Sequence, residues 1–121
     1  MFNLFKKGEE PKDFKDILKQ FEDLEKKVDK ISQEFSDLKK KSRLFVQKVG
    51  MVRYNPFSGV GGDQSFSIAL LDANNNGVII TGIYNREGSR VYAKPIKDGQ
   101  SEYSLSDEEK EAISKSLTPN N

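Results

Sequence analysis

Apolar residues recur at alternating steps of three and four along the first third of the chain. The repeat begins at Phe14 and runs without a miss to Leu38. Its members are Phe14, Ile17, Phe21, Leu24, Val28, Ile31, Phe35 and Leu38. This spacing is typical of the core of a coiled coil. Since residues 11–48 contain no glycine and no proline after Pro11, the pattern predicts one coiled-coil helix over 11–48.

A helix of about 37 residues would be roughly 55 Å long, longer than a small domain is wide. We therefore expect self-association through the coil. The alternative is a single helix whose apolar stripe lies on the protein's own sheet. Three phenylalanines at one core position are bulky for a parallel dimer, which leaves the oligomer number and the helix orientation open.

After Gly50 the apolar period changes to about two, which predicts strands. The candidate strands are 49–54, 65–71, 78–84 and 90–96. The links DANNNG, from Asp72, and NREGS, with Gly88 at a left-handed position, are short and rich in turn residues. Such links favour hairpins and an antiparallel meander. Pro95 lacks an amide donor, which places its strand at a sheet edge.

Side chains of two kinds alternate along the second candidate strand. Phe66, Ile68 and Leu70 share one face, and Ser65, Ser67 and Ala69 share the other. Successive side chains of a strand point to opposite faces of the sheet. The pattern predicts that the large apolar face is the core and that the opposite face is small and polar.

The last segment, SDEEKEAISKSL, predicts a short helix that begins with a capping box of Ser106 and Glu109 and docks on the sheet through Ala112, Ile113 and Leu117. The expected fold class is α+β, with a long N-terminal coiled-coil helix, a small antiparallel β-meander of about four strands, and a short C-terminal helix packed on the sheet. We expect a disordered or weakly amphipathic N-terminus (1–10), the coiled coil (11–48), a small α+β domain (49–117) and a disordered tail (118–121).

Composition narrows the chemistry. The 121 residues include no histidine and no cysteine, which removes imidazole acid–base catalysis, thiolate nucleophiles and most zinc sites. A net charge of +1 argues against a nucleic-acid partner, which normally requires a strongly basic face. We find no catalytic motif, and we expect a protein that is not an enzyme and that uses no cofactor and no metal.

The N-terminus bears on location. No apolar run approaches the roughly 20 residues that span a bilayer. The start MFNLFKKG is too short and too interrupted for a signal peptide, so we expect a cytoplasmic protein. Its apolar residues followed by two lysines leave weak peripheral contact with the inner face of the membrane as an alternative.

The stretch SGVGGD, from Ser58 to Asp63, is rich in glycine. It does not fit a phosphate-binding loop, because no lysine and hydroxyl follow Gly62 and the next element is a strand rather than a helix. We interpret it as the connection between the first two strands. Whether this loop is functional stays open.

Basic and aromatic residues suggest a binding site. Its candidate residues are Arg53, Tyr54, Asp63, Arg90, Tyr92 and Lys94. An arginine fork beside a tyrosine can hold a carboxylate or a phosphate. Arg53 would join the residues of the last strand only if the first and last strands come close with matching parity. The alternative is a solvated sheet face.

Three acids lie near predicted strand ends and could in principle hold a hard metal ion: Asp63, Asp72 and Glu87. Nothing in their spacing pairs them. Asp72 is better explained as the first residue of a turn, and Glu87 as an exposed hairpin residue.

Several pieces of the chain carry a family resemblance. They are VGMVRYNPF, GGDQSFSIALLD, NNNGVIIT, REGSRVYAKPI and YSLSDEEKEAI. The segment from Gln47 to Leu117 resembles the bacterial family catalogued as domain of unknown function 4446. The resemblance implies a small domain after a helical, coiled-coil-like segment, and it brings no established ligand or catalytic residue. Typical members begin with a transmembrane helix, but only MFNLFKKG precedes the coil here, so membrane anchoring is not carried over.

These observations favour a non-enzymatic interaction or scaffold protein, which oligomerises through the coiled coil and presents its β-domain to an unknown protein partner. The alternative is a sensing domain that binds a small anion or an acidic peptide through the basic and aromatic sheet face.

Overall fold

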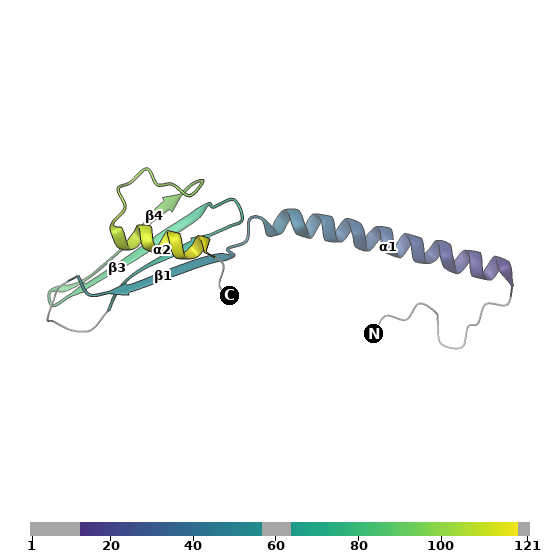
Figure 1. Cartoon of the computed structure of the whole chain (residues 1–121). Helices are drawn as coiled ribbons and strands as arrows, with labels where there is room; N and C mark the ends of the chain where they lie inside the picture. The colour runs from purple at the N-terminus through teal and green to yellow at the C-terminus, as the bar shows by residue number, and fades with distance from the viewer. Residues whose placement is uncertain (1–12, 57–63, 119–121) are drawn as a thin grey trace. The chain divides into compact units, whose positions relative to one another are not determined.

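A computed structural model of the chain describes residues 13–56 and 64–118. The chain divides into two compact units, Met1–Lys40 and Lys41–Asn121. A long helix, α1, precedes a four-stranded sheet and a second helix, α2 (Figure 1). The predicted α+β class is confirmed. The predictions for residues 1–10, for Ser58 to Asp63 and for the last three residues fall outside the described residues.

Helix α1 spans Phe14–Ser42, a length of 29 residues. Asp13 caps its start, since Asp13 Oδ1 accepts a hydrogen bond from the backbone N–H of Asp16 at 2.9 Å. The prediction that the helix continues to Lys48 is wrong, because the chain leaves the helix after Ser42 and Lys48 begins a strand.

Hydrogen bonds explain why α1 ends early. The backbone N–H of Phe45 and the Nε2 of Gln47 both donate to the carbonyl of Ser42, at 3.1 and 2.8 Å. The backbone N–H of Gln47 donates instead to the carbonyl of Leu71 in the sheet, at 2.9 Å. The main chain has therefore joined the sheet within five residues of the helix end.

The four strands form an antiparallel meander, as predicted. They are β1 (Lys48–Tyr54), β2 (Ser65–Leu71), β3 (Gly77–Asn85) and β4 (Gly88–Ile96). Their order across the sheet is β1-β2-β3-β4, so β1 and β4 are the two edges. Pro95 lies in the edge strand β4, as its missing amide donor predicts.

Both short links form the expected hairpin loops. Asp72 Oδ1 accepts hydrogen bonds from the backbone N–H groups of Asn74 and Asn76, at 2.8 and 3.0 Å, and Asn75 has a φ of 63°. In the second hairpin Gly88 has a φ of 141°, which glycine tolerates because it lacks a Cβ. The predictions for Asp72 and for a positive φ at Gly88 are confirmed.

Helix α2 spans Asp107–Leu117 and begins with the predicted capping box. The N–H of Glu109 donates to Ser106 Oγ at 3.1 Å, and the N–H of Ser106 donates to Glu109 Oε1 at 2.8 Å. The helix lies on one face of the sheet and packs mainly against β1 and β2 (Figure 1). Leu117, predicted to dock on the sheet, is 44% exposed at the end of the helix.

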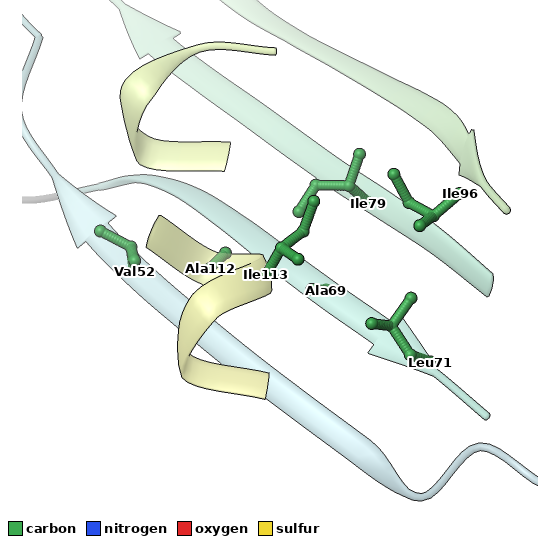
Figure 2. Close-up of a cluster of buried hydrophobic side chains, with 7 residues drawn as sticks. All are labelled: Val52, Ala69, Leu71, Ile79, Ile96, Ala112 and Ile113. Carbon is green, nitrogen blue, oxygen red and sulfur yellow. The ribbon is translucent and has the colours of Figure 1, made fainter. Parts of the chain in front are cut away.

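A compact apolar cluster joins α2 to the sheet. Its members are Val52, Ala69, Leu71, Ile79, Ile96, Ala112 and Ile113. Figure 2 shows Ala112 and Ile113 of the helix close to Val52, Ala69 and Ile79 of three adjacent strands. The core is small because only one face of the sheet contributes to it.

The face of the sheet that α2 covers is not the predicted one. Ser65, Ser67 and Ala69 are completely or almost completely buried, whereas Phe66, Ile68 and Leu70 are only half-buried. The reason is the close approach of the helix. A Cβ added at Gly50 would lie 2.1 Å from the carbonyl oxygen of Ala112, so small residues are needed where α2 crosses the strands.

The other face, which we call the open face, is covered by no described element of the unit from Lys41 onward. It consists of the odd-numbered positions of 49–53 and 89–95 and the even-numbered positions of 66–70 and 78–84, which are aligned by the strand register. Most of these residues are apolar, and Arg53 is the charged residue among them. Among the described residues of this unit, one largely apolar face of the sheet is therefore open.

Candidate functional site

The first candidate surface is the heptad seam of α1. No residue of the described helix is buried, and seven of the eight predicted core residues are more than half exposed. They are Phe14, Ile17, Phe21, Val28, Ile31, Phe35 and Leu38, while Leu24 is intermediate. A row of large apolar residues this long has no structural purpose on a lone solvated helix, because burial of such a stripe supplies most helix stability in proteins.

The predicted basic and aromatic site is not assembled as one constellation. Arg53 lies on the open face of β1, while Arg90 and Tyr92 lie on the covered face of β4. These two strands are opposite edges of the sheet, so the stated condition for Arg53 to join the others is not met. Tyr54 lies on the covered face, and Asp63 is outside the described residues.

Lys94 already has partners within the chain. Its Nζ lies 2.8 Å from Glu109 Oε1 and 2.8 Å from the carbonyl oxygen of Ser104. The Glu109 side chain is only 2% exposed, and the Lys94 side chain 23%. This ion pair links the edge strand β4 to the first turn of α2. The Lys94 ammonium therefore has a structural role within the chain.

Glu109 is the centre of a buried polar cluster that the sequence did not predict. Its Oε2 accepts a hydrogen bond from Thr81 Oγ1 at 2.7 Å, and the hydroxyls of Thr81 and Ser67 are 2.9 Å apart. Because the Thr81 proton points to the carboxylate, Ser67 must donate to Thr81. Tyr54 extends the cluster, because its hydroxyl is hydrogen-bonded to the side chain of Ser67.

Electrostatics keep the two ends of this cluster in opposite protonation states. Burial alone raises the pKa of Glu109, but hydrogen bonds from Lys94, the backbone N–H of Ser106 and Thr81 outweigh it, so the pKa is lowered from 4.5. Burial, aided by the nearby acids of α2, raises the pKa of Tyr54 above 10.0 despite the hydrogen bond with Ser67. Glu109 is therefore a carboxylate and Tyr54 a neutral phenol.

The cluster has the properties of a structural junction. Every buried side-chain nitrogen and oxygen in the described residues has a hydrogen-bond partner, so none of these atoms is left unpaired for a ligand to bind. The remaining acids do not change this view. Asp72 is engaged in its turn, and the N–H of exposed Glu87 donates to Asn85 Oδ1 at 2.9 Å.

Two further findings concern the described ranges as a whole. Within 13–56 and 64–118 no group of three or more acidic side chains is placed to hold a metal ion. None of the helices that the structure describes combines the length and the apolar character needed to cross a bilayer.

The residues of the buried cluster could have been noticed in the sequence, but their pattern fits an exposed position as well as a buried one. Glu109 fits a capping box, which explained it fully as a surface residue of the first helical turn. Serine and threonine at alternate strand positions equally fit a solvated face. The small residue Ala112 on the docking side of the helix was the remaining hint, since a close helix crossing requires small side chains on both partners.

These features define a class: a small α+β domain with one helix-covered and one open sheet face, in a chain that also carries a long helix with an exposed heptad seam. The chain belongs to the family described as Protein of unknown function (DUF4446), whose profile matches residues 1–117. The match includes α1 as well as the sheet domain. No curated protein and no solved structure matched the chain.

Proposed function

We propose that this is a non-enzymatic interaction protein, in which α1 joins copies of the chain and the sheet domain is the unit presented to a partner. The observation that carries the proposal is the unbroken heptad seam with no buried residue in the described helix. The absence of histidine and cysteine and the engagement of Lys94 and Glu109 with each other are consistent with a role that is not catalytic.

The energetic argument concerns the helix itself. Most helix stability in proteins comes from packing of an apolar face rather than from the helix propensity of the residues. No residue of the described helix α1 is buried. Association of two or more seams would provide such packing, with alternating core residues that pack as knobs into holes.

Sedimentation velocity of the full chain at micromolar concentration tests this proposal. We expect an assembly larger than a monomer, and a change to monomer, or at least tenfold weaker association, when Leu24→Asp and Ile31→Asp place two charges in the seam.

The matched control is Lys26→Gln with Ser36→Asp. These exposed positions lie outside the seam, and the pair changes the net charge by the same amount. The control should sediment like the wild-type chain. A wild-type chain that is monomeric throughout the micromolar range would contradict association through α1.

A further inference from the structure

The open face of the sheet is an apolar surface that the proposed function leaves unexplained. Val49, Met51 and Val91 are each more than half exposed there, at 57%, 51% and 68%. They lie on the two edge strands, so the apolar surface extends across the full width of the sheet. A sheet normally buries its apolar face against a second layer, and an exposed patch of this extent marks an interaction surface.

The middle of this surface is also apolar and is ordered by the strand register. Ile68 of β2 pairs with Ile80 of β3, and the row continues to Met51 and Ala93 at the edges. In the neighbouring row the ring of Phe66 lies over Gly82, where an added Cβ would be 2.6 Å from the ring. The middle of the face is therefore a continuous apolar layer.

The dimensions select the kind of partner that fits. Four strands about 4.8 Å apart make a face roughly 19 Å wide, and about seven residues along each strand make it about 24 Å long. A single helix is about 10 Å in diameter and covers only half of that width. A second four-stranded sheet covers all of it.

The chain's own α1 fits this face poorly. At 29 residues the helix is about 44 Å long, so a large part of its seam would project beyond the sheet. We infer that the open face packs against the open face of a second copy of the chain, so that two sheets form a sandwich with α2 on each outer side.

Chemical complementarity and size both support a second copy. A two-fold interface brings one surface against itself, which an apolar face with few charges allows without like-charge repulsion. The area is on the order of 450 Å² per copy from the strand spacing, or about 900 Å² for the pair. That lies at the low end for specific interfaces, so the sandwich is weak alone and gains from any link that holds two copies together.

Cysteine cross-linking of the full chain tests the sandwich. The chain has no cysteine, so Ile80→Cys introduces one thiol at the centre of the face, where a two-fold axis would bring two copies close together. We expect a short bis-maleimide to join the Ile80→Cys chain into a covalent dimer. The control Glu111→Cys, on the exposed side of α2, should stay monomeric in the same gel.

A second measurement uses charge. Val91→Glu places a carboxylate at an exposed edge position, which costs little in a monomer but opposes stacking of two faces. We expect the Ile80→Cys cross-link to fall at least about fivefold in the Val91→Glu background. Tyr103→Glu, which changes an exposed aromatic residue outside the face, should leave the yield unchanged.

The outcomes separate this inference from the proposed function. If the chain associates but Ile80→Cys does not cross-link and Val91→Glu has no effect, the sandwich is overturned while the coiled coil stands. If Leu24→Asp with Ile31→Asp leaves the cross-link intact at high protein concentration, the sandwich is supported independently of the coil. Joining within one chain in the variant Leu24→Cys with Ile80→Cys would place α1 on the face and overturn the sandwich.

Discussion

At the scale of single residues, Glu109 of α2 is bonded to both β3 and β4. One carboxylate connects Lys94 of β4, Thr81 of β3 and the capped start of α2. Hydrogen bonds to a charged group contribute more than neutral ones, and loss of one partner leaves the others buried without compensation.

Glu109→Gln should destabilise the domain by about 2 kcal/mol, because the amide keeps the shape but loses the charge that Lys94 and Thr81 face. Chemical denaturation followed by tyrosine fluorescence measures this change. Glu111→Gln on the same helix is the control. Glu111 and Lys115 are exposed and 3.7 Å apart, so this variant should lie within about 0.5 kcal/mol of wild type.

The same comparison has a pH dependence with a defined sign. Because the pKa of Glu109 is lower in the folded chain than the ordinary 4.5, its stabilisation is complete above that value and is lost as the pH falls through the folded pKa. The stability difference between wild type and Glu109→Gln should shrink below about pH 4.5. A difference that stays constant down to pH 3, about one and a half units below the ordinary pKa, would contradict a lowered pKa of Glu109 in the folded chain.

Sequence reasoning captured part of this residue-scale chemistry. Spacing was enough to identify the reciprocal bonds of Ser106 and Glu109, since a capping box is local. The bonds from Thr81 and Lys94 arise from residues 28 and 15 positions away, and only the three-dimensional packing of α2 on the sheet brings them together.

At the scale of secondary-structure elements, the strands could be predicted within two residues, whereas the orientation of the sheet could not. Hydrophobicity alone selects the face with Phe66, Ile68 and Leu70 as the core. The backbone of helix α2 instead lies close to the backbone of the sheet. Only the face with glycine, alanine and serine permits this close approach. The early end of α1 could not be predicted for a similar reason, because it depends on the hydrogen bond of the Gln47 backbone N–H to the sheet.

Gly50→Ala tests the close crossing of α2 over β1. The new Cβ would meet the Ala112 carbonyl oxygen at 2.1 Å and the Ser116 backbone nitrogen at 2.4 Å, so the helix must shift. We expect a loss of about 3 kcal/mol in unfolding free energy, as for other overpacked sites. Denaturant titration of the full chain gives the value.

Gly88→Ala is the matched control for this change. A Cβ at Gly88 meets nothing within 4 Å, and only its φ of 141° opposes alanine. We expect a cost of about 1 kcal/mol there. Equal losses at the two glycines would mean that the helix does not cross β1 closely.

At the scale of the whole molecule, the two units differ in how their stability arises. The sheet unit has its own buried cluster, whereas the described α1 has none. The helicity of α1 should therefore depend on protein concentration. The structure of the sheet unit should depend on concentration much less. Sequence periodicity predicted the seam, but an intermolecular partner cannot be read from one chain.

Two spectroscopic signals can test this difference. All four tyrosines lie between Tyr54 and Tyr103, so tyrosine near-ultraviolet circular dichroism reports on the sheet unit alone. On dilution, the far-ultraviolet helical signal should fall while the tyrosine signal persists. Leu24→Asp with Ile31→Asp should show the low helical signal at every concentration, and a simultaneous loss of both signals would argue against separate stabilities.

The opposite pKa shifts of Glu109 and Tyr54 have a consequence for the environments in which the protein can work. One group releases its proton further below neutrality and the other further above it, so the junction under α2 has a widened interval of constant charge. The chain also lacks histidine, the side chain that ordinarily titrates near pH 7. Moderate acidification or alkalinisation should therefore leave Glu109 ionised and Tyr54 neutral, so the charges of these two groups stay constant.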